Sequence, residues 1–297
     1  MPSLAPHAER VTFEVAGDRV VGDLHLPTRA GVSPGVVVAG PMTSVKEQVS
    51  GVYAAALARR GIAALAIDPR YFGESEGHPR QYEHHARKVE DLRAALAALG
   101  RRTEVDSARL GMVGVCLGAG YAVWAAVGEP RVRAVATVVG YYRDPTAIRA
   151  MDPAAFDAKV EQGVRAREHY ERTGEVLTVP AVALEGDAAM QSRDTFDYYA
   201  SARGGVDNYR NAFAVMSREH FLTFDVQAAA ARLAVPLTMV HSERALSPAW
   251  ARAFRAKVEA PATLAWLESR AHTDFYDDPA LVAGASDIVA AHLARHL

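Results

Sequence analysis

The chain has 297 residues, of which half are hydrophobic and 23% are charged, and its formal net charge is −2. Such a balance is typical of a globular enzyme and gives no basic surface for nucleic acid. The N-terminal region has neither a signal-peptide pattern nor an apolar run of about 18 residues, so we expect a cytoplasmic protein without a membrane partner. The one cysteine, Cys116, has no disulfide partner, and no Cys/His cluster has metal-ligand spacing. We therefore expect no metal or cofactor.

The chain opens with two strand-like runs around the turn-rich "AGDR", which predicts an antiparallel hairpin. Apolar runs that predict further strands follow at 35–40, 62–68, 109–115, 133–140, 235–242 and 263–269. Amphipathic helical patterns lie between them, and a last one begins at Pro279. Strands that are apolar on both faces and alternate with helices predict an α/β fold: a mostly parallel sheet covered by helices on both faces.

Residues 141–232 interrupt this alternation with helical, polar and aromatic stretches. Insertions at the carboxyl edge of a parallel sheet often cover a ligand pocket. We therefore predict a core domain formed by 1–140 and 233–297, with 141–232 inserted as a mainly helical cap.

Cys116 lies in "GVCLG", where an apolar run gives way to a helical pattern. A nucleophile on a sharp strand-to-helix turn requires small residues two positions away on either side, and Gly114 and Gly118 meet this requirement. The helix N-terminus would favour a thiolate and lower the pKa of Cys116 below about 8.5. The alternative is a buried structural cysteine, because free cysteines are often buried.

The order of these features resembles the α/β-hydrolase superfamily: hairpin, alternating units, "GVCLGAG", an inserted segment, then "VHSE" and "AHTDFYD". A cysteine at the nucleophile position is similar to the dienelactone hydrolase branch. The stretches "GPMTSVKEQ", "DPRYFGESEG" and "DYYASARGG" resemble a capped bacterial group related to that branch. The resemblance implies the α/β-hydrolase fold and the chain order nucleophile, acid, base.

His272, between the last predicted strand and the last helix, matches the family's catalytic base. The usual acid is missing, because Ala245 stands about where the superfamily has an aspartate. Glu243 is our candidate to orient His272, and Asp187 and Asp274 are the alternatives. A Cys–His ion pair needs less orienting help than a serine does, so we expect a preformed thiolate–imidazolium pair.

Two backbone N–H groups should form the oxyanion hole, and Leu117, which follows the nucleophile, supplies the first. The second should come from the loop after 35–40, where Pro41 has no N–H and Met42 is the expected donor. The resemblance also places Glu47 of this loop near the thiol, where it would contact substrate. The alternative for Glu47 is an acid in the first turn of a helix.

A thiolate leaves a tetrahedral intermediate more readily than an alkoxide or an amide does, so Cys116 indicates activated acyl groups. We predict a hydrolase of thioesters, lactones or aryl esters, with a small-molecule or carrier-bound acyl substrate contacted by Tyr141, Tyr142 and Tyr198. An acyltransferase or a Dieckmann-type cyclase would use the same residues. A binding protein that lost the acid is a further alternative, suggested by Ala245.

Overall fold

The computed structural model describes residues 8–28 and 31–297, so residues 1–7 and 29–30 of the predicted core lie outside the described part. Its main sheet has eight strands in the order β1-β2-β4-β3-β5-β6-β9-β10. These strands are β1 (Ala8–Val15), β2 (Asp18–His25), β3 (Ser33–Ala39), β4 (Ala63–Asp68), β5 (Val105–Val115), β6 (Val132–Val138), β9 (Leu237–His241) and β10 (Ala262–Trp266). β2 pairs antiparallel with β1 and β4, and all other neighbours are parallel. The predicted hairpin and mostly parallel sheet are confirmed.

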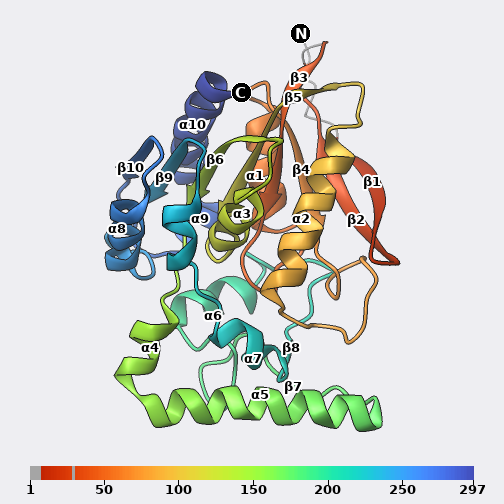
Figure 1. Cartoon of the computed structure of the whole chain (residues 1–297), viewed down its shortest axis with the longest axis vertical. Helices are drawn as coiled ribbons and strands as arrows, with labels where there is room; N and C mark the ends of the chain where they lie inside the picture. The colour runs from red at the N-terminus through yellow and green to blue at the C-terminus, as the bar shows by residue number, and fades with distance from the viewer. Residues whose placement is uncertain (1–7, 29–30) are drawn as a thin grey trace.

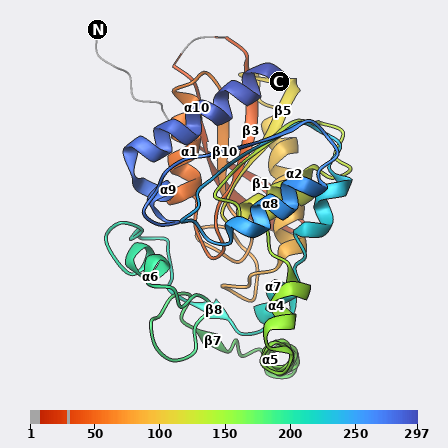
Figure 2. The ribbon, with the colours of Figure 1, turned by 90° about the vertical axis from the view of Figure 1, so that its left-hand side faces the viewer.

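Helices cover both faces of the sheet (Figures 1 and 2). On one face α1 (Val49–Ala58) packs against α10 (Pro279–His296), and on the other α2 (His85–Leu99) packs against α3 (Gly118–Ala126). α8 (Pro248–Lys257) lies against β10. Within the described residues, no helix combines the length and apolar character that a membrane span requires.

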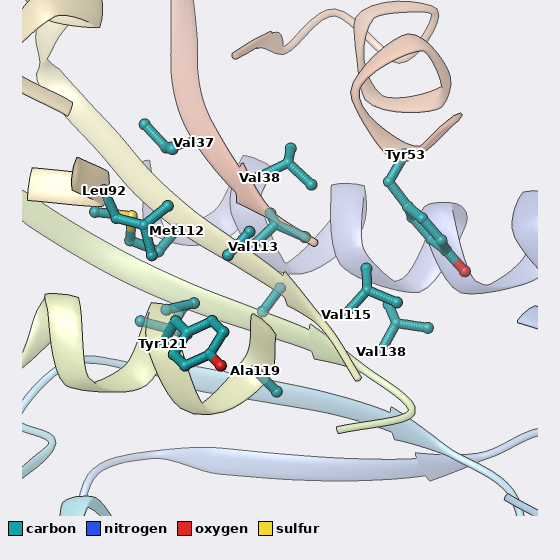
Figure 3. Packing of buried hydrophobic residues seen from close by; sticks show 14 of the residues in the cluster. Val37, Val38, Tyr53, Leu92, Met112, Val113, Val115, Ala119, Tyr121 and Val138 are labelled. Carbon is teal, nitrogen blue, oxygen red and sulfur yellow. The ribbon is translucent and has the colours of Figure 1, made fainter. Parts of the chain in front are cut away.

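The central strand β5 is buried on both faces, as its continuous apolar run predicts (Figure 3). Met112 lies on the side of Leu92 and Tyr121, whereas Val113 and Val115 point to the opposite side, where Tyr53 lies. Each such side chain contributes about 1.5–3 kcal/mol when it leaves water. This packing fixes the end of β5, from which the candidate nucleophile projects.

The segment 141–232, called the cap segment below, lies beyond the carboxyl ends of the parallel strands, at the bottom of Figure 1. It consists of α4 (Pro145–Met151), α5 (Pro153–Thr173), β7 (Thr178–Val179), α6 (Arg193–Tyr199), β8 (Phe213–Ala214), α7 (Ser217–Leu222) and the 3₁₀ helix η1 (Gln227–Arg232). The long helix α5 begins where the Asp152 side chain accepts the Ala155 N–H and ends at Gly174, whose φ is +75°. The last turn, η1, packs back against α3 and α8.

Candidate active site

Cys116 lies on the turn between β5 and α3 with a φ of +56°. Its N–H donates to the Val138 carbonyl (3.1 Å), and its own carbonyl accepts the N–H groups of Ala119 (3.1 Å) and Tyr141 (2.9 Å). A cysteine in the left-handed region is strained, and such residues gather at functional sites. The hydrogen bonds to neighbouring elements hold the strained turn in place.

Gly114 and Gly118 are required by close backbone approaches. A Cβ at Gly114 would collide with the Gly118 carbonyl, and a Cβ at Gly118 would collide with the Ala39 carbonyl at the end of β3. The glycines therefore let β5, α3 and β3 meet beside Cys116. The neighbouring backbone, and not the side chain of the nucleophile, is therefore what requires glycine at both positions.

The two predicted oxyanion-hole donors are free of main-chain acceptors. The Leu117 N–H lies beside the Cys116 sulfur. The Met42 N–H has no acceptor among the described residues, while its neighbour Thr43, with a φ of +59°, donates its N–H to Glu83 Oε2 (2.8 Å). An unused buried N–H beside the elbow fits an oxyanion donor, and this role of Met42 and Leu117 stays a prediction.

Glu83, which the sequence did not single out, holds the Met42 loop. Besides the Thr43 N–H, this buried carboxylate accepts the Tyr121 hydroxyl (2.6 Å) from α3 and binds Lys88 Nζ (2.6 Å). It thereby ties the loop to the helix that follows the nucleophile. An acid in a stretch as polar as "YEHHARK" suggests a solvated helix start, so the sequence held no signal for this role.

His272 precedes α9 (Asp274–Asp277) and is only 5% exposed. Its Nε2 lies 3.1 Å from the Tyr276 hydroxyl, and that hydroxyl lies beside the Cys116 sulfur. A buried tyrosine thus bridges the candidate nucleophile and base. The spacing of His272 and Tyr276, four residues apart in a helical turn, was the signal that could have identified the pair.

The other ring nitrogen of His272 has an unexpected partner. Nδ1 accepts the backbone N–H of Leu246 at 3.2 Å. A neutral imidazole carries one proton, so this bond places the proton on Nε2, facing Tyr276. A catalytic acid would instead accept a proton from Nδ1. The loop that contains Ala245 therefore presents a donor where the superfamily presents an acceptor.

None of the three candidate acids forms a hydrogen bond with the His272 ring, whose partners are Leu246 and Tyr276. The Glu243 side chain is 62% exposed and its partner is Arg252, so our prediction that it orients His272 is wrong in this structure. The alternatives also have other partners: Arg218 for Asp187 (2.6 Å), and the N–H groups of Arg270 and Ala271 for Asp274 (2.9 and 3.1 Å).

Burial keeps both candidate catalytic groups neutral. It raises the pKa of Cys116 to about 11, although hydrogen bonds from Tyr276 and Leu117 act in the opposite direction. It lowers the pKa of His272 to about 3, and nearby His241 adds to this effect. These shifts are opposite to the expected low cysteine pKa and to a preformed thiolate–imidazolium pair.

Glu47 does not bind the thiol; it belongs to a cluster of charges at the end of β4. Lys46 Nζ lies 2.5 Å from Glu47, 3.1 Å from Asp68 and 2.6 Å from Glu74, and Asn208 of the cap segment also donates to Glu47 (2.6 Å). The three carboxylates are close enough to share a cation. The lysine ammonium already supplies the positive charge there.

Two of the three tyrosines that were predicted to contact the substrate lie at the site. Tyr141 donates its N–H to Cys116, and Tyr198 packs edge-to-face on Tyr276 with ring centroids 5.0 Å apart. Tyr142 is corrected: it is fully buried in the core, where its hydroxyl bonds Thr137 (2.6 Å).

The cap segment contacts the loop that carries His272. The Thr273 N–H donates to Asp194 (3.0 Å), and Arg203 binds Asp277 (2.7 Å). Cys116 is only 8% exposed under this cover. The cap segment thus helps to hold the loop that carries His272 in place beside the buried Cys116.

Comparisons with known proteins agree with this fold. The family model of FrsA-like esterases matches residues 3–145. The uncharacterized protein PA2218 of Pseudomonas aeruginosa is 32% identical over 284 residues, covering 90% of this chain and 76% of that protein. Its crystal structure superposes with a TM-score of 0.84 at 29% identity, covering 99% of this chain and 95% of that one.

Two further proteins are similar over part of the sequence or in fold alone. Thiohydrolase aneE of Aspergillus aculeatus is 35% identical over 132 residues, which cover 44% of this chain and 41% of that protein. A dienelactone hydrolase of Anabaena variabilis superposes with a TM-score of 0.61 at 14% identity over 99% of both chains, which shows a shared fold.

Proposed function

The chain belongs to the FrsA-like esterase family and is an α/β-hydrolase, and from this premise we propose that it is a cysteine-dependent acyl hydrolase. The observation that carries the proposal is Cys116 itself. It occupies the strained turn between β5 and α3, with the Leu117 N–H beside its sulfur. An inert core cysteine needs neither feature.

In the proposed reaction the Cys116 sulfur attacks the carbonyl carbon of the acyl group, and the S–C bond forms as the S–H proton leaves. The oxyanion accepts hydrogen bonds from Met42 and Leu117. The intermediate collapses by breaking the bond to the leaving group, which receives the proton. Water then hydrolyses the acyl-thioester and restores the thiol.

The proton must pass through Tyr276, because its hydroxyl lies between the sulfur and His272 Nε2. For Nε2 to accept a proton, the proton that it carries must move to Nδ1, and the Leu246 N–H must leave Nδ1. The structure thus describes a resting form. Opening of the cap segment, which binds Thr273 next to His272, supplies a route to this rearrangement.

Thioesters are the substrate class that we favour. The tetrahedral intermediate of a thioester can expel the thiolate of the substrate as readily as it expels Cys116, so the acyl-enzyme can form. The intermediate of an alkyl ester or an amide would mostly expel Cys116 and return to substrate. The name of thiohydrolase aneE supports the same class. Tyr141 and Tyr198 at the site suit an apolar or aromatic acyl group.

Pre-steady-state kinetics with a p-nitrophenyl ester tests the proposal. We expect a burst of about one equivalent of nitrophenolate per active site, because acylation precedes hydrolysis. The burst should disappear in Cys116→Ala and after alkylation with iodoacetamide at alkaline pH. Nitrophenolate release that is the same in Cys116→Ala would overturn the proposal.

A further inference from the structure

Buried lysine and arginine side chains are paired with carboxylates in the described part of this protein, with one exception. Five such side chains are buried there: Lys46, Arg70, Lys88, Arg143 and Arg218. Four have carboxylate partners, namely Asp68 for Lys46, Asp91 for Arg70, Glu83 for Lys88 and Asp187 for Arg218. No ion pair among the described residues includes Arg143, although it is only 3% exposed.

The surroundings of Arg143 satisfy only part of its guanidinium. Nη2 donates to the Leu222 carbonyl (3.0 Å), and Nε is buried without an acceptor. The guanidinium carbon lies 4.3 Å from the Phe221 ring centroid and 5.8 Å from that of Tyr141. Aromatic faces attract the cation, but they do not replace the anion that a buried guanidinium ordinarily has as its partner. Arginine does not lose its proton in proteins, so the charge remains.

Arg143 also lies next to the nucleophile in the fold. β5 and β6 are parallel neighbours, Cys116 follows β5, and Arg143 follows β6 on the same edge of the sheet. The Arg143 N–H donates to the Tyr141 carbonyl (2.9 Å), and the Tyr141 N–H donates to the Cys116 carbonyl. Ligands of parallel sheets bind at this edge. Phe221 and Leu222, which contact the guanidinium, belong to the cap segment, whose first residues include Arg143 itself.

We propose that Arg143 binds a carboxylate on the acyl part of the substrate. The inference rests on the proposed function and narrows its substrate class to acyl groups with a second, ionised carboxyl, such as half-thioesters of dicarboxylic acids. A guanidinium can donate two parallel hydrogen bonds to a carboxylate, and one of them would use the buried Nε donor, which has no acceptor here. The phosphate of a carrier-bound thioester fits Arg143 less well than such a carboxylate does. That phosphate is separated from the acyl group by the long pantetheine-type arm of the carrier, which would lead out to solvent.

Binding to the inactive Cys116→Ala variant tests this without turnover. The probes are the N-acetylcysteamine thioesters of glutarate and of pentanoate, which have the same chain length and differ in the terminal carboxylate. We expect the glutaryl thioester to bind Cys116→Ala more tightly by about 10- to 150-fold, the range for hydrogen bonds to charged groups. Adding Arg143→Met should abolish this preference.

A matched control and a second variant make the test specific. Arg232 also lies over an aromatic ring, that of Trp124, but outside the site, so Arg232→Met should leave the glutaryl preference intact. Arg143→Lys keeps the charge without the fork of donors and should keep only part of the preference. Equal binding of the two thioesters to Cys116→Ala, or a preference that survives Arg143→Met, overturns the inference.

Failure of the Arg143 inference and failure of the hydrolase proposal give different results. If the wild type turns over the pentanoyl and glutaryl thioesters equally well and Arg143→Met does not change the ratio, the hydrolase proposal stands and the role of Arg143 falls. If Cys116→Ala prefers the glutaryl thioester but the wild type hydrolyses neither, Arg143 binds the anion and the hydrolase proposal fails.

Discussion

Two parts of the carboxyl edge of the sheet differ in whether their buried ionisable groups have partners of opposite charge. Beside β4, Lys46 is surrounded by Glu47, Asp68 and Glu74, and every charge has a partner within 3.1 Å. Beside β5 and β6, Cys116 and His272 are neutral, and Arg143 has no carboxylate. The first part is complete without a ligand, whereas the second leaves buried donors unused.

This difference separates structural from functional polar groups. The Lys46 cluster fixes the loop that carries Met42, because the Lys46 N–H itself donates to Asp68 (2.7 Å). We propose that the Met42 N–H donates to the oxyanion of the intermediate and that Arg143 binds a carboxylate of the substrate. Substitutions on the two sides should therefore affect different quantities: stability on one side and turnover on the other.

The largest expected effect is that of Cys116→Ser on turnover. We expect normal folding and a loss of at least about 10³-fold in kcat/KM for thioesters, because His272 lacks a carboxylate to stabilise it while it removes a proton from an alcohol. Steady-state kinetics and circular dichroism measure the two quantities. A serine variant as active as the wild type would show a site with a competent acid.

Lys46→Met should have the largest effect on stability. It leaves buried Asp68 without its counter-ion, and breaking a buried ion pair costs about 3–5 kcal/mol of unfolding free energy. The matched control is Arg143→Met, which leaves no carboxylate unpaired and should cost far less. Urea denaturation measures both variants, and equal losses would remove the distinction between the two sides.

His272→Gln should lower kcat/KM by about 10²-fold or more, the usual effect of losing a general base. Tyr276→Phe removes only the bridging hydroxyl and tests the proton route separately. We expect a smaller loss, with Tyr198 still packed on the ring. If Tyr276→Phe is as active as the wild type, the proton passes directly between Cys116 and His272.

The alkylation of Cys116 should depend on pH in the manner of a buried thiol. Burial raises its pKa to about 11, so the thiolate fraction at neutral pH is below that of a free cysteine. The rate with iodoacetamide should rise about tenfold per pH unit between pH 7 and pH 10. A plateau below pH 9 would indicate a preformed thiolate after all.

Glu243→Gln should have the smallest effect. The carboxylate is exposed and bound to Arg252, and such surface pairs contribute about 0–1 kcal/mol. We expect kcat/KM within about twofold of the wild type and an unfolding free energy within about 0.5 kcal/mol. A loss comparable to that of His272→Gln would mean that Glu243 swings to His272 during catalysis.

The fold and the elbow could be predicted because their signals are local. Apolar runs predict strands such as β5. The spacing of Gly114 and Gly118 around Cys116 predicts the sharp turn, because the turn needs glycine at both positions. The partner of His272 could not be predicted in this way. It is the backbone N–H of Leu246, which every residue but proline offers, so no side chain reveals it.

Charged residues of the site were missed for a different reason. Arg143 and Glu83 lie in polar stretches that suggest solvated surface, and only the folded chain shows that both are buried. Glu47 was misplaced because its carboxylate pairs with the buried ammonium group of its neighbour Lys46. The direction of a side chain in a loop depends on distant residues, here Asp68 and Asn208.

Mass spectrometry of the intact protein mixed with a thioester tests the central claim, the acyl-thioester on Cys116, most directly. The protein is quenched in acid within the first turnover and digested to locate the modified residue. We expect the mass to increase by that of the acyl group minus one hydrogen, with the acyl group on the peptide that contains Cys116 and none on Cys116→Ala. Hydrolysis without an adduct on Cys116, or an adduct that persists in Cys116→Ala, would contradict the account.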